Sequence, residues 1–189
     1  MYLKNMSSRY GLVSRFFHWT IFALFAWQFA SANVMTRIGR DSALLDMDQD
    51  FLYNWHKSIG LVLIVLALAR IVWRRTTPLP QWSGALNDRE RSLVHRIERW
   101  LYILMFAVPV SGYLFVMAGG YGVRFLGLYD LPDTIGRSAT LAGWAHFAHV
   151  ALTYAALVVI SWHVGLGLKK HFVDRSRYLH RMLPFSRGE

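Results

Sequence analysis

Two histidines in the last long apolar run of the chain have the type and the spacing to hold cofactors. His149 and His163 are 14 residues apart, and because that spacing is two heptads, both side chains leave a helix on nearly the same face. The helical rise between them is about 21 Å, most of the way across a bilayer core of about 30 Å. A histidine inside a membrane span is costly, so the pair predicts two large cofactors held one above the other.

Four apolar segments are long enough to position such cofactors. Hydrophobic residues make up 54% of the chain and charged residues only 17%, which is typical of a small membrane protein. Each segment is near the ~20 residues that a spanning helix needs, and a backbone in hydrocarbon must satisfy its own hydrogen bonds. The alternative, a soluble bundle, requires a polar stripe that these segments lack. The sequence therefore predicts an all-α, integral membrane four-helix bundle with spans at about 16–34, 55–73, 100–117 and 144–168.

Length and composition restrict the remaining possibilities. The 189 residues show no repeat and suffice for one domain, so residues 1–189 are predicted to form a single transmembrane domain. The chain has no cysteine, which excludes thiolate-held iron–sulfur clusters and the C-x-x-C-H attachment of c-type haem. No cleavable signal peptide is evident, because the first ten residues are polar and the apolar run after them is too long.

Positive charge predicts the orientation in the membrane. Of the 21 Lys and Arg, 15 lie in the N-terminal segment, in the connection between the second and third spans, and in the C-terminal tail. Because cytoplasmic loops carry the excess of Lys and Arg, both termini should be cytoplasmic. This segregation explains the net charge of +10 without a nucleic-acid partner. The long outer connection at 119–143 should lie back on the bundle as a cap, the alternative being that it shapes an entrance.

The predicted topology gives each histidine of the last span a partner. His18 lies near the cytoplasmic start of the first span, at the depth of His163. His56 lies at the outer start of the second span, at the depth of His149. Two imidazoles that face each other across a bundle are what a six-coordinate haem b needs. Single histidines are often hydrogen-bonded core residues or proton relays, and zinc usually needs four ligands, so two matched pairs favour two b haems.

Other polar residues are weaker candidates. His146 is rotated about 100° from the face of His163, which makes His149 the better ligand. Arg70, near the end of the second span, either snorkels to head groups or pairs with haem propionates, alongside Arg15 or Arg74. Lys57 contacts a propionate of the outer haem, draws small anions toward that haem, or is a plain interface lysine.

Three further histidines lie outside the spans. His171, at the cytoplasmic rim, either binds a quinone head group or is solvated. His95 is predicted to be a surface residue, and His180 to belong to the tail.

Nearly the whole chain resembles the bacterial cytochrome b561 family. The resemblance is carried by the order and spacing of several motifs together. They are RYGLVSRFFHW at 9–19, WHKSIG at 55–60, ARIVWR at 69–74, PLP at 78–80, LVHRIERWLYILMFAVPVSGYL at 93–114, the spacing of His149 and His163, and KKHFVDRSRYLHRMLP at 169–184.

The resemblance implies a fold and a function. Family members are four-helix bundles of the bacterial inner membrane with two bis-histidine b haems, here His18 with His163 and His56 with His149. They move electrons between the quinone pool and another donor or acceptor. One member type is a superoxide oxidase, which takes electrons from superoxide at the outer face and reduces ubiquinone. That analogy strengthens His171 as a quinone-site candidate.

Three classes of function follow from these observations. The first is transmembrane electron transfer through two b haems, with superoxide:ubiquinone oxidoreductase as its enzymatic version and no catalytic side chain required. The second is a membrane-anchor cytochrome b subunit that exchanges electrons with a periplasmic redox protein. The third is a haem-free transporter or scaffold, which an absorption spectrum would distinguish.

Overall fold

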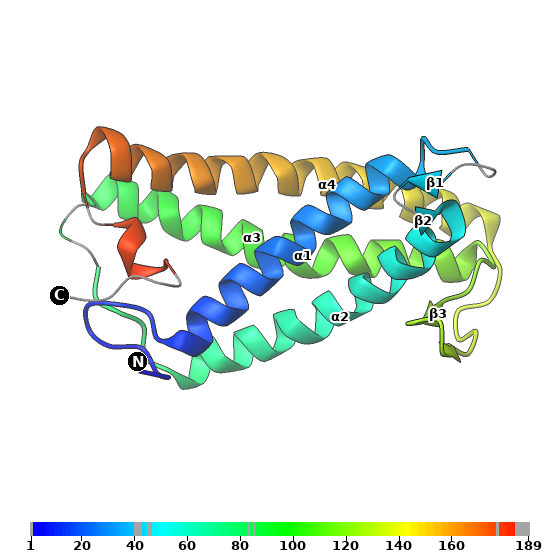
Figure 1. Ribbon diagram of the computed structural model, residues 1–189, viewed down its shortest axis with the longest axis horizontal. Coiled ribbons are helices and arrows are strands. Elements are labelled where there is room, and N and C mark those ends of the chain that lie inside the picture. The colour runs from blue at the N-terminus through cyan, green and yellow to red at the C-terminus, as the bar shows by residue number, and fades with distance from the viewer. Residues whose placement is uncertain are drawn as a thin grey trace.

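Four long helices form an elongated bundle in the computed structural model (Figure 1), which describes residues 2–39, 43–44, 47–82, 84, 86–176 and 178–183. In this part of the chain the predicted all-α four-helix architecture is confirmed. The long helices are α1 Leu12–Met35, α2 Gln49–Thr76, α3 Asp88–Ala118 and α4 Ala139–Leu168.

All four helices begin before the apolar segments that predicted them, and polar side chains cap α2, α3 and α4. The Asp48 side chain accepts a hydrogen bond from the Phe51 amide at the start of α2. At the start of α3, Asn87 and Glu90 form a reciprocal capping box, which satisfies two amides that a helix start leaves open. Both α2 and α3 therefore begin with a polar extension ahead of the hydrophobic stretch.

Length and composition allow most of the bundle to cross a membrane. Within the described residues, three helices are long and apolar enough to do so: α2, α3 and α4 with its continuation to Val173. The fourth helix, α1, is also long but includes Gln28, Ser31 and Asn33 in its second half. Of these, Gln28 and Asn33 line the cavity of the candidate site.

The two ends of the bundle differ (Figure 1). At one end, here called the tail end, lie the N-terminal segment, a π-helical turn η1 that continues α4, and a short 3₁₀ helix η2. At the other, the hairpin end, lie two short antiparallel hairpins. The small elements are η1 Lys169–Val173, η2 Leu179–Arg181, β1 Ala43–Leu44, β2 Met47–Asp48, β3 Arg124–Phe125 and β4 Tyr129–Asp130.

The predicted cap at 119–143 does lie against the bundle, through one buried serine. The Ser58 hydroxyl accepts from the Leu126 amide at 2.8 Å and lies 3.4 Å from the Arg124 carbonyl oxygen. Ser58 is fully buried, so it fixes the β3–β4 hairpin to α2. The apolar residues at the tip do not share this contact, since Leu128 is 84% and Tyr129 64% exposed.

The C-terminal tail folds over the tail end of the bundle. The Arg15 guanidinium donates to the carbonyl oxygens of Tyr10 and Leu183, and the Trp19 indole donates to the Met182 carbonyl at 2.9 Å. Arg181 donates to two further carbonyls, those of Ser8 and Gln81. Residues more than 160 positions apart in the sequence thus close this end.

Candidate cofactor-binding site

The structure brings the four predicted histidines together in two pairs. His18 of α1 faces His163 of α4 with ring centroids 6.0 Å apart, and this is the tail-side pair. His56 of α2 faces His149 of α4 with centroids 6.3 Å apart, and this is the hairpin-side pair. Within each pair the rings are not stacked, since their planes meet at 54° and 87°.

The separation within each pair fits one metal ion between two imidazoles. A ligating imidazole nitrogen lies about 2.0–2.1 Å from its metal, so two rings on opposite sides of a metal have centroids roughly 6 Å apart. No group of three or more His, Asp or Glu side chains that could hold a metal occurs in the described part of the chain. A pair of imidazoles therefore suits a cofactor that brings its own equatorial ligands, as haem does.

An apolar layer separates the two pairs. Its buried members include Ile21, Leu63, Ala67 and Met105. Leu63 follows His56 by seven residues, which is two turns of the same helix face. The layer therefore keeps the two pairs as distinct sites along α4.

Contacts from α3 orient His149. Its Nδ1 lies 2.9 Å from the Val108 carbonyl oxygen and 3.4 Å from the Ser111 hydroxyl. A proton on Nδ1 bonded to that carbonyl leaves Nε2 with its lone pair for a metal. A β-carbon on Gly112 would lie 2.9 Å from Cε1 of the His149 ring, so the glycine makes room for the imidazole.

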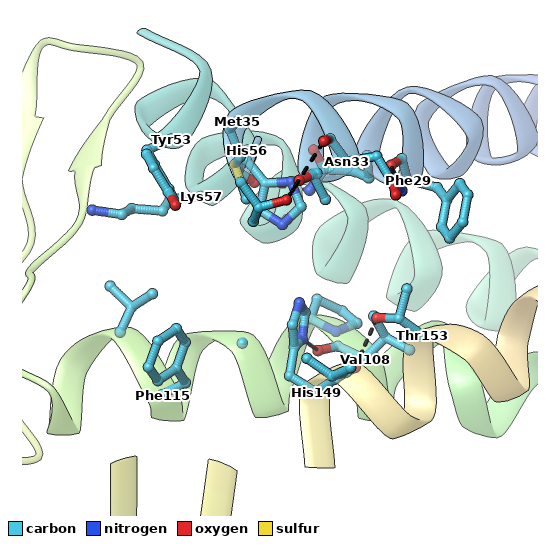
Figure 2. A pocket seen from close by; sticks show the side chains of 18 of the residues that line it. Phe29, Asn33, Met35, Tyr53, His56, Lys57, Val108, Phe115, His149 and Thr153 are labelled. Atoms are coloured by element: carbon cyan, nitrogen blue, oxygen red, sulfur yellow. Dashed lines mark hydrogen bonds between the residues drawn. The ribbon is translucent and has the colours of Figure 1, made fainter. Parts of the chain in front are cut away.

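A large cavity surrounds the hairpin-side pair. Its volume is about 1510 Å³, which exceeds the ~300–1,000 Å³ of most small-molecule sites. Figure 2 shows His56 and His149 on opposite sides of this opening, with Phe29 and Asn33 of α1 and Phe115 of α3 around it. The Nδ1 atom of His56 is buried and has no hydrogen-bond partner among the described residues. The cavity is thus large enough for a flat macrocycle such as haem, and the imidazoles of His56 and His149 are suited to bind its iron from the two sides.

Of the three predicted arginines, only Arg70 faces the tail-side pair without a carboxylate partner in the described residues. It is within electrostatic range of both His18 and His163, and its Nε lies 3.3 Å from the Tyr102 hydroxyl. Arg15 instead bonds to backbone carbonyls, and Arg74 pairs with Glu98 at 2.7 Å. Arg15 and Arg74 thus already have partners in this structure, and a propionate contact for either of them stays a prediction.

The other predicted polar residues lie at the two ends. The Lys57 ammonium donates to the Gly122 carbonyl at 3.1 Å, and Lys57 extends away from His56 in Figure 2. His146 lines the cavity and packs on Phe115 with centroids 4.7 Å apart.

The remaining histidines lie toward the tail end. The buried Nδ1 of His171 has no hydrogen-bond partner in the described chain, and its ring lies 5.4 Å from that of His180. His95 packs on Trp82 with ring centroids 4.8 Å apart, and Trp82 belongs to neither histidine pair.

Gln28 belongs to the hairpin-side site, and the sequence analysis did not single it out. Its amide nitrogen donates to the His56 carbonyl at 2.8 Å, while its Oε1 is buried without a partner in the described residues. It also lines the cavity. A glutamine in the middle of a predicted span is a polar residue inside the membrane, and such residues often mark a functional site. This position could therefore have identified Gln28 from the sequence.

The fold and the paired histidines define a class, that of small membrane cytochromes of the b type. Sequence comparison gives the family: residues 9–185 match the prokaryotic cytochrome b561 model. The chain belongs to the prokaryotic cytochrome b561 family, and so is a haem-binding electron-transport protein of the prokaryotic membrane.

Curated relatives match this chain from end to end. Cytochrome b561 homolog 2 of Escherichia coli (strain K12) is 30% identical over 100% of this chain and 98% of its own length. The probable superoxide oxidase CybB of Yersinia pestis is 24% identical over 97% of this chain and 100% of its own length. Cytochrome b561 homolog 1 of Escherichia coli (strain K12) is 21% identical over 94% of this chain and 98% of its own length.

Proposed function

We propose that the chain is a single di-haem domain that carries electrons across the bacterial inner membrane. His18 and His163 would hold one haem b, and His56 and His149 the other. The tail end would face the cytoplasm, as the excess of Lys and Arg there predicts. The observation that supports this most is the separation of the rings within each pair, 6.0 and 6.3 Å, which suits bis-histidine ligation in both.

In this proposal the protein side chains bind and orient. When bound, haem b supplies the one-electron chemistry of its iron. Val108 fixes the tautomer of His149 through its carbonyl oxygen, and Gln28 holds the backbone of His56. Bis-histidine ligation leaves no open coordination position, which favours electron transfer over oxygen binding.

A quinone is the proposed acceptor at the cytoplasmic face, with His171 as a binding residue. The buried, unpartnered Nδ1 of His171 supports this role, because a buried polar atom calls for a hydrogen-bond partner. Arg70 and Lys57 are proposed to interact with the propionates of the tail-side and hairpin-side haems. Arg70 has the stronger support, since the Lys57 ammonium is already bonded to Gly122.

Superoxide is the proposed donor in the enzymatic version of this function. The name of one relative, probable superoxide oxidase, supports it, and the cavity at the hairpin-side pair offers an approach from the outer face. Purified haem-replete protein should then reduce ubiquinone in a superoxide-dependent manner. Absence of that reaction would exclude superoxide as donor and leave the electron-transfer proposal to the test below.

The membrane-anchor function is the second candidate. The exposed Leu128 and Tyr129 at the tip of the β3–β4 hairpin support it, because they offer apolar contact to a periplasmic subunit. Co-purification of a redox subunit with the chain would favour this function. A single chain that is active when purified would count against it.

Electron transfer is tested in proteoliposomes with a reductant enclosed and a membrane-impermeant oxidant outside. The haem-loaded protein should oxidise the enclosed reductant, and His149→Ala and His163→Ala should each abolish this, because each interrupts the path. His95→Ala is the control, since His95 packs on Trp82 outside both pairs. Equal rates in all three variants would refute the proposed path.

A further inference from the structure

Arg70 occupies on α2 the position that a second ligand would have. It follows His56 by 14 residues, the same interval that separates His149 from His163 on α4. Leu63, which is only 2% exposed, lies midway between His56 and Arg70. Residues at this spacing share one helix face, so α2 presents an imidazole to the hairpin-side pair and a guanidinium to the tail-side pair.

Tyr102 of α3 holds the Arg70 guanidinium from one side. The Arg70 Nε donates to the Tyr102 hydroxyl at 3.3 Å, and its guanidinium carbon lies 5.6 Å from the centre of the Tyr102 ring. Arg74 also lies over this ring, at 5.4 Å. The Tyr102 ring therefore contacts two guanidinium groups. These two cations repel each other unless an anion lies nearby.

Glu98 supplies that compensation to Arg74 by direct contact, and its charge also acts on His163. The Nη1 and Nη2 atoms of Arg74 donate to the two oxygens of the Glu98 carboxylate, at 2.7 and 2.9 Å. Such two-point pairs are geometrically specific, so Glu98 neutralises Arg74 where it stands. Arg70 remains, among the described residues, without a carboxylate partner and beside His18 and His163.

No arginine lies among the described residues that line the cavity of the hairpin-side pair, and its two carboxylates are on exposed side chains. The described residues that line its cavity include the carboxylates of Asp48 and Asp50 and one ammonium, that of Lys57. The Lys57 ammonium is turned to the Gly122 carbonyl. With haem bound, the charge of Arg70 would favour the reduced iron at the tail-side pair relative to the hairpin-side pair.

We propose that Tyr102, Arg74 and Glu98 form a positioning network that leaves Arg70 as the uncompensated cation at the tail-side pair, and so gives the tail-side haem the higher midpoint potential. This inference rests on the proposed di-haem function. An electron that enters at the hairpin-side pair then moves to the tail-side pair with a favourable change in free energy. The network thus sets the direction of transfer toward the tail end.

Redox titration of the haem-loaded protein, followed by its α-band, tests this inference. Arg70→Gln should lower one of the two midpoint potentials and leave the other unchanged. Removal of a unit charge from a low-dielectric site should change the ratio of reduced to oxidised haem by about tenfold, which is about 59 mV for a one-electron couple. Glu98→Gln should shift the same potential in the opposite direction, because it leaves Arg74 uncompensated.

Two control variants separate charge from structure. Arg70→Lys keeps the charge and should restore most of the lost potential. Arg75→Gln makes the same change in charge one residue from Arg74, but on an exposed side chain, where solvent and salt screen the effect. In a His163→Ala background, which should retain only the hairpin-side haem, Arg70→Gln should shift nothing.

The outcomes distinguish the inference from the function on which it rests. A chain that binds two haems but responds equally to Arg70→Gln and Arg75→Gln would overturn the network. A shift of the same sign in Arg70→Gln and Glu98→Gln would do so as well. A chain that binds fewer than two haems before any substitution would overturn the di-haem function itself.

Discussion

The two histidine pairs share their ligand chemistry and differ in their surroundings. The hairpin-side pair opens into a cavity of about 1510 Å³ that carboxylates and a lysine help to line. The tail-side pair lies beneath a folded-back tail, where Arg15 and Trp19 bond to the carbonyls of Leu183 and Met182, and beside the Arg70 guanidinium. The histidines of each pair thus select the cofactor. In the proposed function, the cavity and the nearby charges then determine at which pair an electron enters and at which pair it is held more favourably.

Removal of one ligand from either pair gives the largest effect that the comparison predicts. We expect His163→Ala to lose the tail-side haem and His149→Ala to lose the hairpin-side haem, so that each variant keeps one of two haems. The apolar layer that includes Leu63 and Met105 keeps the sites independent. Haem content per chain and the α-band of each variant measure this, with His95→Ala as the variant that keeps both. Loss of both haems from a folded single variant would show that the sites are not separate.

Gly112→Ala tests the close packing of a glycine against a histidine, which among the described glycines occurs only at His149. A β-carbon there would meet His149 Cε1 at 2.9 Å and Nδ1 at 3.0 Å, and the imidazole is held in place by its contact with the Val108 carbonyl. We expect a severalfold loss of the hairpin-side haem, with the tail-side haem retained.

Gly143→Ala is the matched control for Gly112→Ala. Gly143 lies in α4 with nothing within 4 Å of its added β-carbon, so this change should gain about 0.5–1 kcal/mol of helix stability and keep both haems. Equal haem content in Gly112→Ala and Gly143→Ala would contradict the packing of His149.

Ser58→Ala should weaken the hairpin end without changing the tail end. The change removes the hydroxyl that the Leu126 amide contacts at 2.8 Å, and the loss of a hydrogen bond costs about 0.5–1.5 kcal/mol. We expect faster proteolysis within residues 119–138 and a lower unfolding temperature. Thr76→Ala, on an exposed side chain of the same helix that bonds only within α2, should change neither. Unchanged cleavage in Ser58→Ala would mean that other contacts hold the hairpin.

The smallest predicted effect is a pH dependence at the tail end. The Lys170 ammonium, 2.7 Å from Asp174, lowers the pKa of that carboxyl below its usual value, which is about 3.9. Because the folded-state pKa is depressed, the contact stabilises the tail above about pH 4 and is lost as pH falls through the lower folded value. Lys169 and Glu90 adjoin the same contact.

Hydrogen exchange of residues 169–183 between pH 6 and pH 3 measures this effect. Asp174→Asn should raise exchange at pH 6 and reduce the change between the two pH values. Asp88→Asn, in an exposed i,i+3 pair with Arg91, should behave as the unaltered protein does. Identical profiles for Asp174→Asn and Asp88→Asn would contradict a role for the Lys170 contact.

Periodicity made the helices and the histidine pairing predictable. The 14-residue interval between His149 and His163 fixes a common face, and positive charge in the loops matched His18 and His56 to them by depth. The helix ends were less visible to hydropathy, because capping residues such as Asn87 extend α3 well before its apolar stretch. The local sequence pattern thus predicts the helix face and the membrane depth of a side chain, but not where its helix begins.

The partners of the polar side chains could not be read in the same way. The sequence offered Arg70, with Arg15 or Arg74 beside it, as propionate candidates, but it could not give their partners. In the structure Arg15 bonds to backbone carbonyls, Arg70 to Tyr102 and Arg74 to Glu98. The contact of Trp19 with Met182 joins residues 163 positions apart. Such contacts depend on how helices and tail pack together, which no single segment encodes.

The ratio of haem to protein in the purified, unaltered chain is the decisive measurement. Two imidazole pairs, with ring centroids 6.0 and 6.3 Å apart, lead us to expect two haems per chain with low-spin, six-coordinate b-type spectra. One haem per chain, or none in a folded sample supplied with haem, would contradict the assignment of both pairs.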